Sequence, residues 1–355
     1  MKIVDGDGHV MEDSAKLAKF LPDPWKSKTN VDRWFPPLDR FHVFTGTPPP
    51  GSFRQVGPDG WLEFLEDIGI ERTVLYTTGG LAIGNVFHND WAIALTRAYN
   101  DYVHEEYLSC SPRFQAMALI PMQEPEAAVD ELARAVEELG FCGAMLPSTG
   151  LPNNLGAKEY WPIYKEADRL GCALGVHGGA HGGLGMDNLN VYTPINGYGH
   201  PFGIAVCFAA MLFNGVFDRY PNARYGFMEG GVAWMLMALE RLDRSHDTHI
   251  QYNPRGELAP RGDASFAEYL RKHISEGRIY VGCEGDEPAV ASTTKELGRN
   301  LAMFSTDFPH EVSIARCKEE IEEIRGRDDL SDEEKDATLF SNAKSFYQPQ
   351  FALTD

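Results

Sequence analysis

The chain has 355 residues, of which 43% are hydrophobic and 24% are charged, so it has the composition and length of a folded globular protein. Its formal net charge of -20 argues against nucleic acid and anionic membrane surfaces as partners, because both require a basic surface. The 6 cysteines form no CxxC pair, which predicts reduced thiols in a cytoplasmic protein, and we expect neither a signal peptide nor a transmembrane helix.

The predicted strands are short apolar runs that recur along the chain, each followed by a helical stretch. They are apolar throughout rather than alternating, which is typical of strands covered on both faces. In chain order they are KIVDGD from Lys2, TVLYTT from Thr73, FQAMALI from Phe114, CGAMLP from Cys142, ALGVH from Ala173, ARYGFME from Ala223, IYVGCE from Ile279 and LAMFSTD from Leu301.

Amphipathic helices are predicted between these strands. EPEAAVDELARAVEELG has acids in its first turn and ends at Gly140, AKEYWPIYKEADRLG ends at Gly171, and GVAWMLMALERLDR follows the sixth strand. Strand and helix alternate about eight times, which predicts an α/β fold of the (β/α)₈ TIM barrel type. We expect one barrel domain over residues 1–355, with an open doubly wound sheet as the alternative.

Two long stretches interrupt the alternation. Residues 20–60 are rich in proline and aromatic residues and form a predicted insertion after the first strand. Residues 178–201 are rich in glycine and form a predicted loop after the fifth strand. Long loops in compact domains are usually functional or disordered, and in a barrel both would lie at the C-terminal face, where active sites are found. We therefore expect the insertion to fold over the barrel mouth and to contact substrate.

Ionisable side chains follow several predicted strands, whereas the strands ending at Thr77, Pro121 and Pro147 carry none. They are Asp7 and His9 with Glu12 just beyond, His177, Glu229, Glu284, and Asp307 with His310. A single histidine at a strand end is more often a structural residue, but converging imidazoles and carboxylates favour a divalent metal site. Asp7 and His9 are two residues apart, so both project from one face of an extended segment.

Four motifs carry a family resemblance over nearly the whole chain. They are VDGDGH at the first strand, GVHGG at the fifth, YPNARYGFMEGGVAWM around the sixth and FSTDFPH at the eighth. In these motifs the sequence resembles the amidohydrolase superfamily, in the amidohydrolase-2 branch that includes aminocarboxymuconate-semialdehyde decarboxylase, resorcylate decarboxylases and several lactonases and hydratases. The resemblance implies a metal-dependent barrel enzyme acting on a small molecule.

The resemblance also implies roles for single residues. The family's first-strand His-x-His motif reads DGH from Asp7 here, its fifth-strand histidine matches His177, and its eighth-strand aspartate, a ligand that can relay protons, matches Asp307. The family's catalytic histidine after the sixth strand is Glu229 in this chain. The carboxylic residue that resorcylate decarboxylases carry shortly afterwards has no match. Both departures weaken the inference of decarboxylation, and Glu229 in place of histidine favours hydrolysis.

Three functions remain open from the sequence. The first is a metal-dependent hydrolase that uses metal-activated water on an amide, ester, lactone or thioester of a small carboxylic acid. The second is a metal-dependent non-oxidative decarboxylase of an aromatic or unsaturated carboxylic acid. The third is a barrel without catalysis, against which the full ligand set argues. We expect the first, with Asp307 and Glu229 as catalytic groups.

The predicted cofactor is one divalent ion or two. Zinc is our first choice, with manganese and iron as alternatives, because mixed ligands suit all three. The predicted ligands are Asp7, His9, His177, Asp307, Glu229 and Glu12, of which Glu229 or Glu12 would help to hold a second ion.

The two long segments supply the candidate substrate contacts. The predicted substrate-binding residues are His181, His200, Tyr198 and Trp34, although aromatic residues in long loops as often pack those loops down. We expect a homo-oligomer, since symmetric dimers are the commonest assembly.

Overall fold

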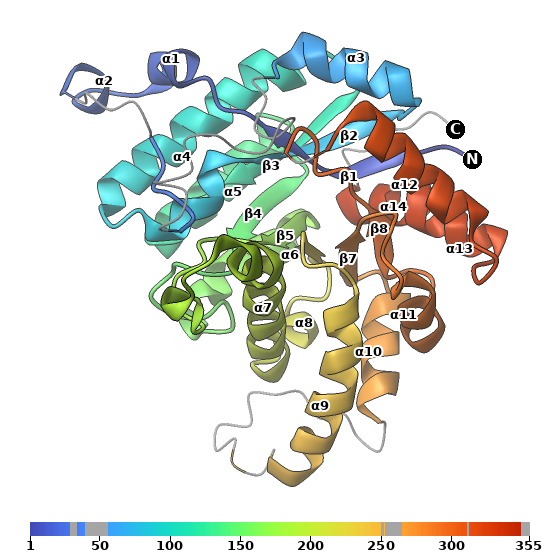
Figure 1. The fold of residues 1–355 in the computed structure, drawn as a ribbon. Coiled ribbons are helices and arrows are strands. Elements are labelled where there is room, and N and C mark those ends of the chain that lie inside the picture. Colours follow the sequence, from blue (N-terminus) through green and yellow to red (C-terminus); the bar gives the residue numbers. More distant parts are fainter. Residues whose placement is uncertain (29–33, 40–55, 250–251, 253–264, 311, 349–355) are drawn as a thin grey trace.

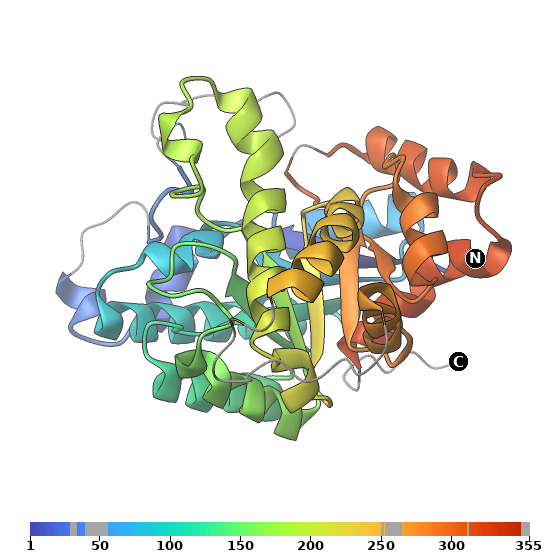
Figure 2. The ribbon, with the colours of Figure 1, turned by 90° about the horizontal axis from the view of Figure 1, so that it is seen from below.

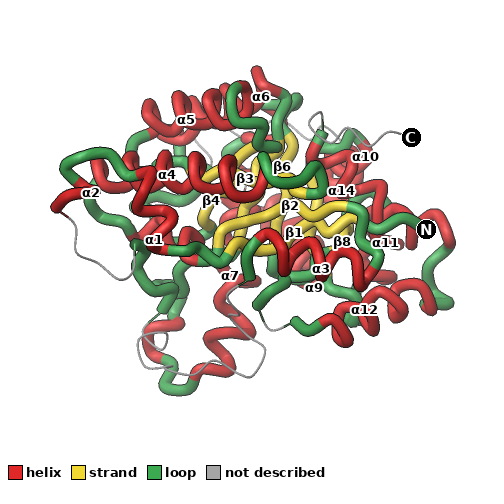
Figure 3. Tube along the Cα trace, turned by 90° about the horizontal axis from the view of Figure 1, so that it is seen from above, coloured by secondary structure: helices red, strands yellow, loops and turns green. Residues whose placement is uncertain are grey.

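The computed structural model describes all residues except 29–33, 40–55, 250–251, 253–264, 311 and 349–355. An 8-stranded parallel sheet runs in the order β1 to β8, and helices surround it (Figures 1 and 3). The strands are β1 Val4–Val10, β2 Arg72–Thr77, β3 Phe114–Leu119, β4 Gly143–Pro147, β5 Ala173–His177, β6 Arg224–Met228, β7 Ile279–Cys283 and β8 Ala302–Phe304.

Main-chain hydrogen bonds join β1 to the segment after β8 and bring the two ends of the sheet together. The amide of His9 donates to the carbonyl of Phe308 at 2.7 Å, and the amide of Asp307 donates to the carbonyl of Asp7 at 2.9 Å. The predicted (β/α)₈ barrel is therefore confirmed. The alternative of an open doubly wound sheet is wrong, because such a sheet reverses its strand order at a switch point.

The strands form where the apolar runs predicted them, and the five residues of β5 are all buried. Strand β1 extends further than predicted, to Val10, although it contains two glycines. Gly8 is required there, because a Cβ atom would lie 2.3 Å from the ring of Trp61. The pairing register with β2 also shifts between Asp5 and Gly8.

The predicted helices are observed as α5, α6 and α9, and α6 ends at Gly171 with a φ of 59°. Helices α1, α2 and α8 have four residues each. The helices are α1 Ser14–Leu17, α2 Trp25–Lys28, α3 Pro58–Ile68, α4 Asn89–Val103, α5 Pro125–Glu137, α6 Trp161–Leu170, α7 Tyr192–Phe213, α8 Val216–Arg219, α9 Ala233–His249, α10 Phe266–Ser275, α11 Val290–Leu297, α12 Ile314–Gly326, α13 Asp332–Asp336 and α14 Asn342–Tyr347.

The segment after β5 differs from the predicted loop. Helix α7 begins at Tyr192 and runs through Pro201, because its buried face, which includes Ile195 and Ile204, packs against the barrel and overrides the helix-breaking residues. Its first turns and the loop before it project beyond the barrel (Figure 2). By length and a mean hydropathy of 1.2, α7 alone among the described helices could cross a membrane, but 50% of that window is buried inside the fold.

The predicted insertion is described only in part, since residues 29–33 and 40–55 lie outside the described residues. Residues 34–39 do reach the C-terminal end of the barrel, where the carbonyl of Leu38 accepts a hydrogen bond of 2.8 Å from the amide of His181. The insertion as a whole stays a prediction.

Candidate metal centre

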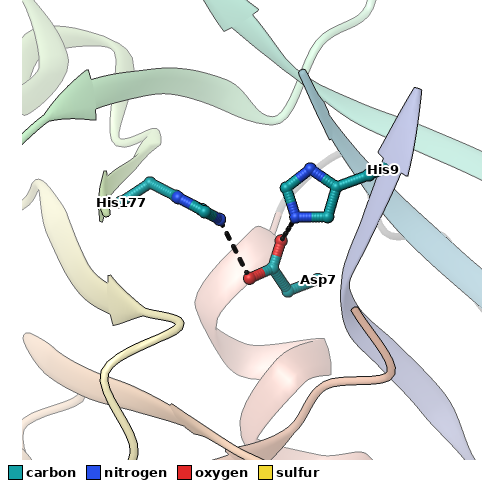
Figure 4. Close-up of side chains that lie close together, drawn as sticks. All are labelled: Asp7, His9 and His177. Atoms are coloured by element: carbon teal, nitrogen blue, oxygen red, sulfur yellow. Dashed lines mark ion pairs between the residues drawn. The ribbon is translucent and has the colours of Figure 1, made fainter. Parts of the chain in front are cut away.

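Strands β1 and β5 bring three buried side chains to one point at the C-terminal end of the barrel. Asp7 lies between the two histidines, with 3.5 Å from its Oδ1 atom to Nε2 of His9 and 3.3 Å from its Oδ2 atom to Nε2 of His177 (Figure 4). All three residues are almost completely buried. Their ligand atoms lie within 4.8 Å of one another, which is close enough to bind one ion.

Asp307 and Glu229 extend this cluster from β8 and β6. Oδ1 of Asp307 lies 3.2 Å from Nε2 of His9, and Oε2 of Glu229 lies 3.5 Å from Nε2 of His177. Both acids have left-handed backbone conformations, with φ of 52° and 56°. Such conformations cost about 1–3 kcal/mol in residues other than glycine and concentrate at functional sites, where the surrounding structure enforces them.

The hydrogen bonds of the two histidines fix which ring nitrogen faces the cluster. Nδ1 of His9 lies 2.8 Å from the carbonyl of Thr77, and Nδ1 of His177 lies 3.0 Å from the carbonyl of Gly178. A carbonyl only accepts, so each Nδ1 atom donates, and in the neutral ring each Nε2 atom presents a lone pair. Both lone pairs therefore face carboxylate oxygens, an arrangement that requires a cation or a proton between them.

Unpartnered atoms at the same point support a cation. The buried atoms Nε2 of His9, Nε2 of His177, Oδ1 of Asp7 and Oε2 of Glu229 have no hydrogen-bond partner among the described residues. Buried polar groups without partners are costly, and one ion would satisfy the atoms of Asp7, His9 and His177 together. The mixed nitrogen and oxygen donors therefore fit a divalent transition metal.

The pKa values of the metal-free cluster reflect the same crowding. Burial, and after it the charge of Asp307, raises the pKa of Glu229 to about 8. Burial alone would lower the pKa of His177, but the carboxylate of Asp7 outweighs it and raises that pKa to about 9. Burial and the neighbouring imidazoles keep the pKa of His9 well below its ordinary value. Protons on Glu229 and His177 would thus compete with a metal ion.

Glu12, a predicted ligand, lies outside both groups of potential ligands among the described residues. Its carboxylate accepts hydrogen bonds from the side chain of Thr77, the amide of Thr78 at 3.1 Å and the amide of Gly79 at 2.9 Å. Glu12 therefore holds the loop after β2 in place. Both carboxylate oxygens of Glu12 therefore accept hydrogen bonds from backbone amides of that loop.

His310 also belongs to the cluster, and it was not among the predicted site residues. Its ring stacks on that of His9 at 4.1 Å between centroids, and its Nδ1 atom lies 2.7 Å from Oδ1 of Asp307. His9, Asp307 and His310 form the second group of potential ligands. The sequence feature that could have identified His310 as a site residue is its position three residues after Asp307 in FSTDFPH.

A cavity of about 560 Å³ opens above the cluster. Of the predicted substrate-binding residues, His181 and His200 line it, and Nε2 of His200 lies 3.5 Å from Oε1 of Glu229. The lining residues that carry charge or an imidazole are His181, His200, Glu229, Glu284, Glu287, Asp307, His310, Arg316 and Glu320. A larger hollow of about 1010 Å³ lies at the opposite end of the barrel and contains none of these residues.

The structure places Tyr198 and Trp34 away from this cavity. Tyr198 is 54% exposed on α7 and stacks on Phe202 at 5.0 Å. The indole of Trp34 donates to the carbonyl of Ser14 at 3.1 Å and packs against Trp91. Neither residue is among the described lining residues, so a role in substrate binding stays a prediction for both.

Comparison with known proteins gives one family and a consistent set of relatives. The amidohydrolase family model matches residues 5–348. The chain is 26% identical over 256 residues to the 2-amino-3-carboxymuconate-6-semialdehyde decarboxylase of Dictyostelium discoideum, covering 72% of this chain and 67% of that protein. It is 25% identical over 273 residues to the gamma-resorcylate decarboxylase of Rhodococcus jostii, covering 70% and 76% respectively.

Solved structures of decarboxylases have the same fold. The 2,6-dihydroxybenzoate decarboxylase from Rhizobium matches with a TM-score of 0.65 and 20% identity over 98% of this chain and 99% of that one. The dihydroxybenzoic acid decarboxylase of Polaromonas was solved with manganese and the inhibitor 2-nitroresorcinol. It matches with a TM-score of 0.67 and 19% identity over 98% of this chain and 97% of that one. The 5-carboxyvanillate decarboxylase of Novosphingobium aromaticivorans, also solved with manganese, matches with a TM-score of 0.73 and 18% identity over 98% of this chain and 96% of that one.

These findings correct the predicted reaction. The expected hydrolase is wrong, because the relatives and solved structures named above are decarboxylases, which was the alternative. Glu229 in place of the family histidine does not by itself indicate hydrolysis, since one position does not define a reaction. A divalent metal is supported, but zinc is not confirmed, because two of the solved structures above carry manganese. With the family matched over residues 5–348, the chain belongs to the amidohydrolase family and is an enzyme of that superfamily.

Proposed function

We propose that the protein is a metal-dependent non-oxidative decarboxylase of a hydroxylated aromatic carboxylic acid. The observation that carries the proposal is the cluster of Asp7, His9 and His177, whose unpartnered buried atoms fit a divalent ion. The decarboxylases among the relatives supply the reaction type.

The proposed ligands are Asp7, His9, His177 and Asp307. We place manganese first, from the neighbouring structures, with zinc and iron as alternatives. When bound, the ion supplies positive charge that holds and polarises the substrate's oxygen atoms. One ion per chain accounts for the unpartnered atoms of Asp7, His9 and His177, and a second ion is not required once Glu12 is bound to the loop after β2.

Glu229 is the proposed proton donor. Its carboxylate lies beside the cluster, 3.5 Å from Nε2 of His177, but outside both groups of potential ligands among the described residues. The proton passes to the ring carbon that bears the carboxylate, the electrons of the broken carbon–carbon bond return to the ring, and carbon dioxide leaves. Asp307, hydrogen bonded to His310, holds the proton of a neighbouring substrate hydroxyl.

The size of the cavity agrees with this substrate class. A volume of about 560 Å³ accepts a single substituted ring, since small-molecule sites span roughly 300–1,000 Å³. Arg316 is the only arginine or lysine among the described lining residues, and it is bonded to Glu320 at 2.7 Å. A substrate with one carboxylate therefore fits better than a polyanion.

The test is carbon dioxide release from hydroxybenzoates labelled with ¹³C in the carboxyl group. Manganese-loaded protein should release labelled carbon dioxide, and the metal-free protein and the manganese-treated His177→Asn variant should not. Water incorporation from ¹⁸O-labelled solvent into esters or lactones, without carbon dioxide release from any acid, would contradict the proposal.

A further inference from the structure

We propose that His181, oriented by Asp39, determines substrate specificity by accepting a hydrogen bond from a substrate hydroxyl remote from the metal centre. The inference rests on the proposed function and deepens it, because it adds a required substituent to the aromatic acid. Asp39 is the positioning residue, and His181 is the residue that contacts substrate.

The two side chains form a buried pair across a long sequence separation. Nδ1 of His181 lies 2.9 Å from Oδ2 of Asp39, and the side chains are only 2% and 6% exposed. The amide of His181 also donates to the carbonyl of Leu38 at 2.8 Å.

The carboxylate fixes the tautomer of the ring. An ionised aspartate only accepts hydrogen bonds, so Nδ1 of His181 must donate, and Nε2 of the neutral ring is then an acceptor. That Nε2 atom is buried and has no hydrogen-bond partner among the described residues. Because His181 lines the cavity, a donor on the ligand can complete the bond.

The surroundings place this acceptor away from the metal centre. The ring of His200 packs edge-on against that of His181, with 4.7 Å between centroids, and Nε2 of His200 lies 3.5 Å from Oε1 of Glu229, so His200 contacts both residues. A Cβ atom on Gly199 would lie 2.7 Å from Nε2 of His181, so this glycine makes room for the ring edge. The ligand group that meets His181 is thus a different one from the carboxylate that reacts.

The required group is a hydrogen-bond donor, and on a phenolic acid it is a second hydroxyl. A methyl ether at that position cannot donate and would leave the buried Nε2 atom unpaired. Sites built to bond a hydroxyl discriminate strongly against analogues that lack it, for this reason.

The probes are 2-nitroresorcinol and its monomethyl ether, titrated into manganese-loaded protein at pH 8 by calorimetry. The wild type should bind 2-nitroresorcinol at least about tenfold more tightly than the ether. In Asp39→Asn the amide can donate to Nδ1, which leaves the proton on Nε2 and makes it a donor. The preference should then fall to within about threefold or reverse.

The matched control is Asp187→Asn, because Asp187 lies near His181 around a neighbouring hollow but does not line the cavity. It should keep the wild-type preference. His181→Phe retains a planar ring without an acceptor and should lose the preference for 2-nitroresorcinol over its ether. This variant tests the proposal if Asp39→Asn does not fold.

The outcomes separate the two proposals. An unchanged preference in a folded Asp39→Asn or His181→Phe variant overturns the role of His181. Equal binding of both probes by the wild type overturns that role alone and leaves the decarboxylase standing. Binding of neither probe overturns the proposed substrate class, and the subsite with it.

Discussion

At the scale of residues, Asp5 and Asp7 lie two positions apart in β1 and have opposite surroundings. Asp5 accepts hydrogen bonds from the hydroxyl of Thr73 at 2.6 Å and from the amide and hydroxyl of Thr306 at 2.8 and 3.0 Å. Oδ1 of Asp7 has no hydrogen-bond partner among the described residues and faces His9. One acid therefore joins β1 to its neighbours, and the other is free to bind an ion.

This contrast predicts different losses in two isosteric variants. Asp5→Asn should retain manganese but lower the free energy of unfolding by about 1–3 kcal/mol, because a buried amide cannot accept all three bonds. Asp7→Asn should keep the fold and lose most of the bound manganese. Urea unfolding and elemental analysis check both variants, and normal metal content in Asp7→Asn would remove it from the centre.

The raised pKa values of Glu229 and His177 predict how the stability of the metal-free protein depends on pH. Each pKa is higher in the folded protein than in the unfolded chain, at about 8 against 4.5 and about 9 against 6.5. The folded state thus binds more protons, and these groups stabilise it at low pH and lose that contribution as pH rises through 8 to 9.

We therefore expect the urea concentration at the unfolding midpoint of the metal-free protein to decrease as the pH is raised from 5.5 to 9. Glu229→Gln should show a smaller fall, because it removes one of the two groups and leaves the rest of the chain's charge unchanged. A fall of equal size in Glu229→Gln would show that this carboxyl does not carry the raised pKa.

At the scale of elements, Glu287 joins the loops after β6 and β7. Its carboxylate accepts a hydrogen bond of 2.7 Å from the amide of Val232 and one of 2.8 Å from the amide of Glu284. The turn at Val232 follows Glu229 and Gly231, which both have positive φ values. Glu287 therefore stabilises the strained turn that directs Glu229 into the cavity.

Glu287→Gln should lower kcat about tenfold with unchanged manganese content, since its amide group would face a backbone donor and release the turn. Glu322→Gln, on the exposed side of α12, is the matched control and should behave as wild type. Equal kcat in the two variants would show that the turn at Val232 keeps its conformation without the hydrogen bond to Glu287.

The strand ends could be predicted from the sequence, because parallel barrel strands point their C-terminal residues to one face whatever the loops do. Asp7, His9, His177, Glu229 and Asp307 were located in this way. Asp39 could not be found, because its partner His181 is 142 residues away in the sequence and only the folded loops bring them together. Glu12 was predicted as a ligand because of its position after β1, but its partners are backbone amides, which the sequence does not reveal.

At the scale of the whole molecule, the centre joins strands that are distant in the sequence. Asp7 comes from β1, His177 ends β5, and Asp307 follows β8, so an ion bound between them links opposite sides of the barrel. The interpretation of residues 1–355 as one domain, the homo-oligomer and the cytoplasmic location stay predictions.

Bound metal should therefore stabilise the fold as a unit. At about 100 times the dissociation constant, manganese should add about 2.7 kcal/mol to the free energy of unfolding. Calorimetric melting with and without manganese measures this, and His177→Asn should show little change. A similar gain in His177→Asn would indicate that the ion binds elsewhere.

The most direct measurement is carbon dioxide release during titration of the metal-free protein with manganese. If the strand-end residues form the catalytic centre, the initial rate with a ¹³C-carboxyl hydroxybenzoate should rise in proportion to bound manganese and reach a plateau at one ion per chain. Release that is already maximal in the metal-free protein, or that is absent at full occupancy with every hydroxybenzoate supplied, would contradict the account.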